Sequence, residues 1–242
     1  MKLNRVFPIL AISFSASSAW AAGGILPDVF NDMPRHVFVP PGFDNNDSSE
    51  IVVRGEFRDT CYQVGPSRVR VDAEGRRIVI ENQAYHYDAF LCMMVLVPYT
   101  KTIPVGILDE GTYAIQFAGD SGSARELGSI TIHPSANGGQ DDFVYAPVEE
   151  LRVDRGELGQ PHSLTLSGTF TDTCMDLADV KVMTRTADVV EVLPIVKFAG
   201  EGCKAEKRSF TRTVWLPGTI RGERLIHVRA LDGQSINRVV TF

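Results

Sequence analysis

Alternation of apolar and polar residues is the clearest pattern in this chain. Residues 51–57 and 164–170 both alternate with a period of two, which predicts a half-buried β-strand in each stretch. The inward face of these two strands carries Ile51, Val53, Gly55, Phe57, Leu164, Leu166, Gly168 and Phe170. We expect each glycine of that face to make room for a bulky side chain on the facing sheet.

Both strands end in the same short motif, GEFRDTC at residues 55–61 and GTFTDTC at residues 168–174. Asp59 and Asp172 are expected to hydrogen-bond the backbone two residues on and so turn the chain toward the cysteine. Other segments recur in the same order: RHVFVP with EELRVD, SRVRVDAEGRRIVIE with ADVKVMTRTADVVEVLP, and GTYAIQFAGDSGSARELGSITI with GERLIHVRALDGQSINRVVTF. The chain therefore contains two copies of one unit.

Each copy consists of about seven short strands separated by Gly, Pro, Asn and Asp turns, without an amphipathic helix pattern. We predict an all-β protein of two tandem antiparallel Ig-like β-sandwich domains, each with one intradomain disulfide. The boundaries are residues 28–134 for the first domain, 135–146 for the linker and 147–242 for the second domain. This architecture resembles that of exported bacterial Ig-like domains. The short linker predicts a semi-rigid pair with room for a cleft at the joint.

Residues 1–22 have the form of a secretory signal peptide, because Lys2 and Arg5 precede an apolar run and a small-residue cleavage signal around Ala21. Removing this leader changes the net charge from −6 to −8, which disfavours nucleic acid and anionic membranes as partners. No later segment is long enough to insert into a membrane. We expect a periplasmic or secreted protein whose partner is another extracytoplasmic protein.

The four cysteines are expected to be oxidised in an exported chain. The spacing from the first cysteine to the second is nearly equal in the two copies. This selects the pairs Cys61–Cys92 and Cys174–Cys203 from the three possible connectivities. Each pair closes a loop of about 30 residues, which the chain-entropy model values at roughly 3 to 4 kcal/mol.

Residues 119–123, GDSGS, resemble the nucleophile motif of chymotrypsin-like serine proteases and make Ser121 a candidate nucleophile. A catalytic triad also needs a histidine base and an aspartate, and that family's histidine motif is absent around every histidine of the chain. The repeat instead aligns this segment with a hairpin turn. We therefore expect no catalytic residue, no cofactor and no enzymatic activity.

Residues 85–94, YHYDAFLCMM, have no counterpart in the second copy, which reads KFAGEGCK there. An aromatic segment next to a disulfide suits a recognition loop, because Tyr and Phe offer large contact area at low entropic cost. The alternative is a strand whose rings belong to the core. The candidate binding residues are Tyr85, His86, Tyr87 and Phe90.

Two segments offer side chains that could bind a metal ion. His86 with Met93 and Met94 offers soft ligands for Cu(I), but neighbouring residues of a strand point to opposite faces, so one or both methionines are expected in the core. Residues 44–50 are rich in oxygen ligands for calcium but depart from the EF-hand pattern and suit a polar turn. We expect no metal site.

The leading hypothesis is a non-enzymatic extracytoplasmic protein-binding or assembly module that uses loops and sheet edges. One alternative is a secreted hydrolase or protease inhibitor that presents residues 85–90. A second is a pilus-type periplasmic chaperone, although ELGSITIHP offers only a short alternation for strand donation. The last is a serine hydrolase acting through Ser121.

Overall fold

The computed structural model describes residues 26–88, 91–139, 141–157, 159–200 and 202–242; the predicted signal peptide lies outside them. The strands are β1 (Asp28–Asn31), β2 (His36–Phe38), β3 (Ser49–Phe57), β4 (Tyr62–Asp72), β5 (Arg77–His86), β6 (Val97–Gly106), β7 (Gly111–Ala118), β8 (Ala124–Ile132), β9 (Val148–Asp154), β10 (His162–Phe170), β11 (Met175–Met183), β12 (Val189–Phe198), β13 (Arg208–Leu216), β14 (Glu223–Ala230) and β15 (Gln234–Thr241). A short 3₁₀ turn, η1 (Leu231–Gly233), joins the last two strands. Among the described residues, no helix is long and apolar enough to cross a membrane.

The predicted fold class is confirmed, because the chain forms two all-β sandwiches with the same strand pairing. The first sandwich has one sheet in the order β2-β3-β6 and a second in the order β4-β5-β7-β8, with β1 added to β5. The second sandwich repeats this as β9-β10-β13 and β11-β12-β14-β15. One pair in each domain is parallel, β5 with β7 and β12 with β14, because the strand between them in sequence lies in the other sheet.

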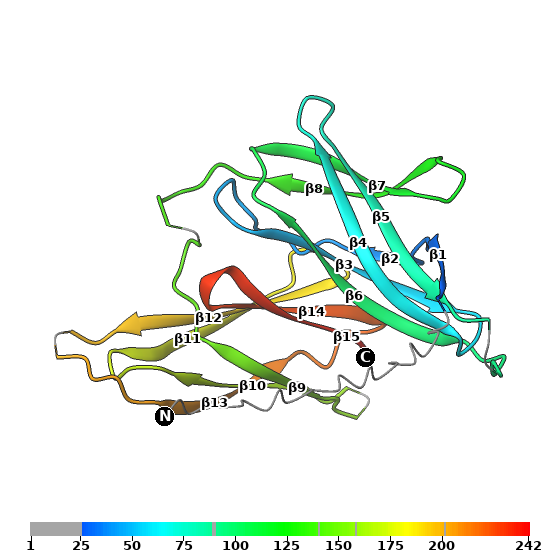
Figure 1. Ribbon diagram of the computed structural model, residues 1–242. Helices are drawn as coiled ribbons and strands as arrows, with labels where there is room; N and C mark the ends of the chain where they lie inside the picture. Colours follow the sequence, from blue (N-terminus) through cyan, green and yellow to red (C-terminus); the bar gives the residue numbers. More distant parts are fainter. Residues whose placement is uncertain (1–25, 89–90, 140, 158, 201) are drawn as a thin grey trace, which may run out of the picture.

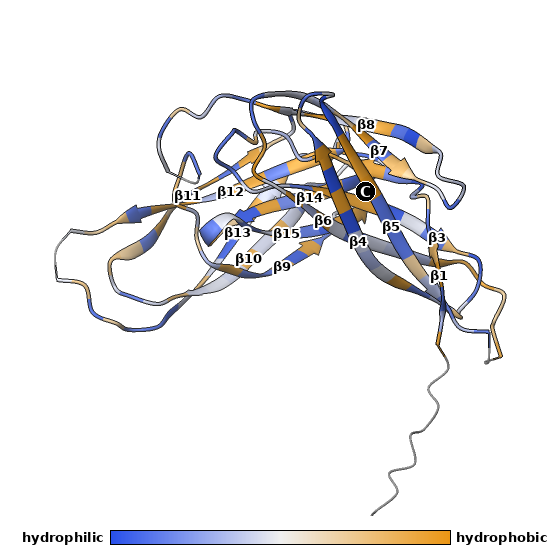
Figure 2. Ribbon diagram, turned by 45° about the horizontal axis from the view of Figure 1, so that its top comes forward, coloured by the Kyte–Doolittle hydropathy of each residue, from blue (hydrophilic) through white to orange (hydrophobic). Residues whose placement is uncertain are grey.

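The alternating strands place their apolar side chains inward, as predicted. Ile51, Val53 and Phe57 belong to the core of the first domain, and Leu164 and Leu166 to that of the second. Figure 2 shows the same alternation of hydrophobic and hydrophilic segments along β4 and β5. Each sandwich therefore has its own apolar core between its two sheets.

The inward glycines make room for a side chain in the same sheet. The prediction that this side chain belongs to the facing sheet is wrong. A Cβ atom on Gly55 would lie 2.4 Å from the ring of Tyr99, its register partner on β6. A Cβ atom on Gly168 would lie 2.9 Å from the ring of Phe210 on β13, and closer still to the main-chain carbonyl oxygen of Pro147. An aromatic ring of the adjacent strand thus takes up space beside each glycine, and this space is used within one sheet.

The two sandwiches lie face to face, which gives the molecule four sheet layers (Figure 1). The outer face of β2-β3-β6 packs on the outer face of β11-β12-β14-β15 through one apolar cluster of Phe38, Val52, Val189, Leu225 and Val239. We call this contact the domain seam. Complete burial of such side chains stabilises by about 1.5 to 3 kcal/mol each, so the seam is a substantial interface.

The segment between the sandwiches is attached to both of them. At its start, the N–H of Ser135 donates to Asn45 Oδ1 at 3.0 Å, in the first domain. At its end, Tyr145 and Ala146 are buried, and the N–H of Ala146 donates to the carbonyl of Pro194 on β12 at 2.8 Å. A surface groove beside the seam is lined by residues of both domains, including Pro40 and Thr186.

Candidate functional site

The repeated motif closes each strand as predicted. Asp59 Oδ1 accepts a hydrogen bond from the N–H of Cys61 at 2.9 Å, and Asp172 Oδ1 accepts one from the N–H of Cys174 at 2.8 Å. These carboxylates are turn-forming groups in two different sandwiches and do not form a catalytic pair.

The threonine of each motif holds the residue that follows the second cysteine. Thr60 Oγ1 accepts the N–H of Met93 at 3.0 Å, and the N–H of Thr60 donates to the carbonyl of Met93 at 3.2 Å. Thr173 makes the same two bonds to Lys204, both at 3.0 Å. We call this arrangement the threonine clamp. It fixes the loop after β5 or β12 at one point.

The predicted disulfides, Cys61–Cys92 and Cys174–Cys203, are both present, with Cα–Cα distances of 5.3 and 5.2 Å. The first disulfide links the turn after β3 to the loop between β5 and β6, and the second links the turn after β10 to the loop between β12 and β13. Paired cysteines are typical of proteins that fold in an oxidising environment.

In the first domain, the loop on both sides of Cys92 is apolar and exposed. Its large side chains and their exposed fractions are Leu91 97%, Met93 62%, Met94 77%, Val95 51% and Leu96 62%. We call residues 91–96 the apolar loop. At the equivalent place after Cys203, the second domain carries Lys204, Ala205, Glu206 and Lys207, also exposed. The same disulfide and clamp thus support an apolar loop in one copy and a charged loop in the other.

The predicted aromatic site lies next to the apolar loop but is less exposed. Tyr85 and His86 end β5 and Tyr87 follows them, and all three are half-buried. The fourth candidate, Phe90, lies outside the described residues. His86 contacts the ring of Tyr62 at a centroid distance of 4.3 Å and pairs with Asp88 at 2.9 Å.

The expectation that Met93 or Met94 fills the core is wrong. Both follow the end of β5 in a loop, so the strand rule of opposite faces does not apply to them, and both side chains are exposed. Asp28, His86 and Asp88 do bring one potential ligand atom each within 4.8 Å of one another. The Nδ1 of His86 already pairs with Asp88, and both aspartates are exposed.

Ser121 lies in the hairpin turn between β7 and β8, as the repeat predicts. The N–H of Gly119 donates to the carbonyl of Ser123 at 2.8 Å, and the hydroxyl of Ser121 lies 2.9 Å from that of Ser123. No hydrogen bond in the described part of the chain joins Ser121 to a histidine. The motif is therefore explained by its turn.

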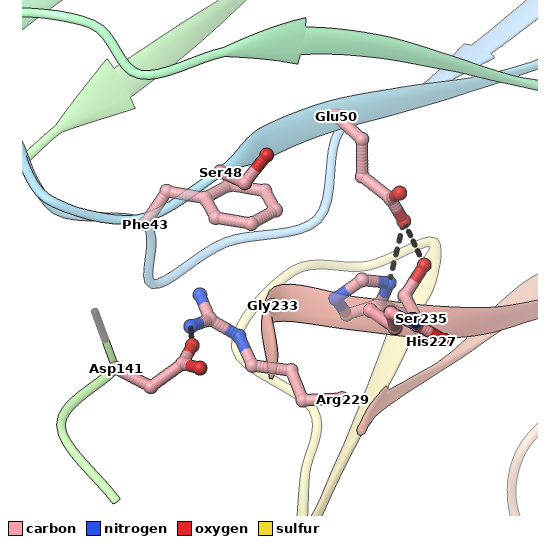
Figure 3. Close-up of a pocket in the computed structure, with 9 residues that line it drawn as sticks. Phe43, Ser48, Glu50, Asp141, His227, Arg229, Gly233 and Ser235 are labelled. Atoms are coloured by element: carbon pink, nitrogen blue, oxygen red, sulfur yellow. Dashed lines mark hydrogen bonds and ion pairs between the residues drawn. The ribbon is translucent and has the colours of Figure 1, made fainter. Parts of the chain in front are cut away.

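The structure adds a polar group that the sequence did not indicate, at the domain seam (Figure 3). Arg229 of β14 is buried and donates to Asp47 Oδ2 at 2.9 Å, to Asp141 Oδ1 at 3.2 Å and to the carbonyl of Gly42 at 2.8 Å. Its guanidinium also lies over the ring of Phe43 at 4.7 Å. Asp47, from the oxygen-rich loop at residues 44–50, is thus one of two carboxylate partners of Arg229, together with Asp141.

Beside Arg229, Glu50 of β3 meets β14 and β15. Its carboxylate accepts a hydrogen bond from Asn237 Nδ2 at 2.6 Å and lies 3.5 Å from His227 Nδ1, which in turn lies 2.9 Å from Asn237 Oδ1. Burial lowers the pKa of His227, an effect that Glu50 and Asn237 oppose. Burial also raises the pKa of Asp141 to about 6, although Arg229 acts in the opposite direction.

The cavity that these seam residues line is too small for an organic ligand. Its volume is about 10 Å³, close to the minimum for one water molecule. The contacts of His227 with Glu50 and of Arg229 with Asp47 join the two domains, so we assign the polar seam a structural role. Among the described residues, the apolar loop is the longest run of consecutive large apolar side chains that are exposed, from Met93 to Leu96.

Comparison with known proteins gives one match. A family model described as the ORF11 beta-sandwich domain matches residues 51–125, from β3 into β8 of the first sandwich. This supports the β-sandwich architecture of the first domain. No curated protein and no solved structure matches the chain.

Proposed function

We propose that this protein is a non-enzymatic extracytoplasmic binding or assembly module that attaches to another protein through its apolar loop. The signal-peptide pattern of residues 1–22 and the two disulfides support export to the periplasm or beyond the cell. The partner offers an apolar recess to the loop, and the half-buried Tyr85, His86 and Tyr87 lie at the border of this contact.

One observation carries the proposal: the second copy serves as an internal control for the first. Lys204, Ala205, Glu206 and Lys207 occupy the positions of Met93, Met94, Val95 and Leu96 beside the same disulfide and clamp. The fold therefore does not need apolar residues at these positions. Clustered, exposed apolar residues are typical of interaction surfaces, because water contact costs free energy that a partner can recover.

The sharpest test transfers the loop of the second copy to the first. The graft variant carries Met93→Lys, Met94→Ala, Val95→Glu and Leu96→Lys. It keeps Cys92 and the two hydrogen bonds that the main chain of residue 93 makes with Thr60. The control variant changes Lys204, Glu206 and Lys207 to alanine in the other loop. Wild type, graft and control are used as oxidised baits for extracytoplasmic extract, followed by mass spectrometry.

We expect a partner that the wild type and the control retain and the graft loses. The interaction is then measured with the purified partner, where the graft should weaken binding at least about tenfold, because several buried side chains are removed from a contact core. Equal retention by all three baits would refute the proposal.

A secreted inhibitor of a hydrolase is the second candidate function. It is favoured by the position of Leu91, which is almost fully exposed next to a disulfide and two residues before the clamp at Met93. A loop held in this way needs little further ordering on binding. The test is inhibition of a panel of purified hydrolases, in which Leu91→Gly should abolish inhibition while the control variant retains it.

A further inference from the structure

The apolar loop contains the two most exposed thioethers of the described chain. All four cysteines are in disulfides, so no thiol competes for an oxidant. Among the other described methionines, Met33 and Met175 pack against the two cores. The sulfur of Met183 lies 3.3 Å from Arg185 Nη2. Met93 and Met94 differ from these three because their side chains are 62% and 77% exposed.

We propose that Met93 and Met94 are a reversible oxidation site, and that their sulfoxidation by a peroxide switches off binding through the apolar loop. This inference rests on the proposed function. In the reaction, each thioether sulfur gives an electron pair to one oxygen of hydrogen peroxide, so that a sulfur–oxygen bond forms as the O–O bond breaks. The proton on the transferred oxygen passes to the departing hydroxide, which leaves as water. The sulfur is oxidised by two electrons and the peroxide is reduced by two.

The consequence for binding follows from polarity. A sulfoxide is a strong hydrogen-bond acceptor, and burying it in an apolar recess costs free energy unless a donor is present. Two adjacent sulfoxides would make the loop resemble the polar loop of the second copy. Methionine sulfoxide is also returned to methionine by reductases, so the change is reversible.

The fold should survive this oxidation. Met93 is held by its main-chain N–H and carbonyl, which bond Thr60, and not by its side chain. The N–H of Val95 donates to the carbonyl of Met93 at 2.9 Å, again a main-chain contact. Oxidation therefore alters the surface of the loop and leaves its anchoring unchanged.

The experiment treats the mature, disulfide-bonded protein with dilute hydrogen peroxide and follows each methionine by peptide mapping. We expect Met93 and Met94 to oxidise at least about tenfold faster than Met33, Met175 and Met183, because peroxide reaches exposed sulfur first. The same samples are run on a hydrophobic-interaction column. Retention should fall toward that of the graft variant, recover after reductase treatment, and stay high under peroxide in the variant with Met93→Leu and Met94→Leu.

These readouts need no partner, so they separate the two proposals. Uniform oxidation of the five methionines, or unchanged column retention after Met93 and Met94 are oxidised, would overturn the oxidation switch. Once a partner is captured, its binding to oxidised wild type should weaken at least about tenfold, while the leucine variant under the same peroxide treatment should keep binding. If the graft itself leaves capture unchanged, the proposed function fails, and the oxidation kinetics still report on the site.

Discussion

At the scale of single residues, Gly55 determines where the ring of Tyr99 lies. That ring crosses the glycine and brings its hydroxyl to Asp32 and to Asn82 Nδ2, the latter at 3.1 Å. In Gly55→Ala the new Cβ would displace the ring and break these bonds, at a cost of about 2 to 4 kcal/mol in the free energy of unfolding. Urea denaturation measures this loss.

The matched control is Gly138→Ala, because a Cβ at Gly138 would meet no atom within 4 Å. We expect its unfolding free energy to change by less than about 0.5 kcal/mol. Equal losses in the two variants would show that glycine content, and not the Tyr99 ring, sets the effect.

His227 makes the stability of the seam depend on pH. It faces Glu50, Glu191, Arg229 and Asn237, and burial lowers its pKa below the ordinary value of 6.5. The unfolded chain therefore binds a proton near pH 6.5 that the folded chain does not bind. The contribution of His227 is present above that pH and is lost as the pH falls through the folded pKa.

We expect wild type to lose more stability than His227→Gln when the pH falls from about 7.5 to about 5. Carboxyls with raised pKa, such as Asp141, act in the opposite direction but are present in both proteins. The difference between the two pH profiles from urea denaturation thus isolates His227. Parallel profiles would contradict the assigned burial effect.

At the scale of elements, the threonine clamp is a small device that the chain uses twice. Thr60→Val removes the acceptor for the N–H of Met93, which should cost about 1 kcal/mol and speed proteolysis within the apolar loop. Thr173→Val is the matched variant in the other copy and should speed proteolysis after Cys203 only. Limited proteolysis with peptide mapping distinguishes the two, and cleavage at the same sites in both variants would contradict a local role.

The strands and their repetition could be predicted from the sequence, but the contact between the two copies could not. The alternation of residues 51–57 identifies the inward face, and the motif ending at Cys61 fixes the disulfide phase. The seam is encoded differently, in strands that are buried on both faces. In β14, Ile226 and Val228 enter the second core while Leu225 enters the seam, so the strand has no simple alternation to read.

The candidate site, too, could be predicted from the sequence only in part. Proximity to the disulfide could be predicted for residues 85–94, since the segment contains Cys92, whose pairing with Cys61 follows from the equal cysteine spacing of the two copies. The exposure of individual side chains in this segment could not be predicted, because it depends on the residue at which β5 ends. The chain leaves the sheet after His86, which exposes Met93 and Met94 and leaves Tyr85 half-buried on the strand.

At the scale of the whole molecule, the two copies stack through different faces. The first uses its β2-β3-β6 sheet and the second its β11-β12-β14-β15 sheet, so the contact is head-to-tail and is not closed by symmetry. The two outer faces that end the stack carry polar pairs: Arg70 bonds Glu81 on one side, and the hydroxyls of Thr165 and Thr213 meet on the other, next to the exposed Trp215.

The seam should make the two sandwiches unfold as one unit. Leu225 is fully buried there against Phe38 and Val52, so Leu225→Asp would place an unpaired charge in the contact and separate the domains. By calorimetry we expect one transition in wild type and two in this variant, with a larger radius of gyration by X-ray scattering. Val52→Asp should do the same from the other side, whereas Val71→Asp on the exposed strand β4 should keep one transition. Two transitions in wild type would show that the sandwiches are energetically independent and that the seam contributes little. One transition in both seam variants, with an unchanged radius of gyration, would show that the coupling of the sandwiches comes from the linker at Tyr145 and Ala146.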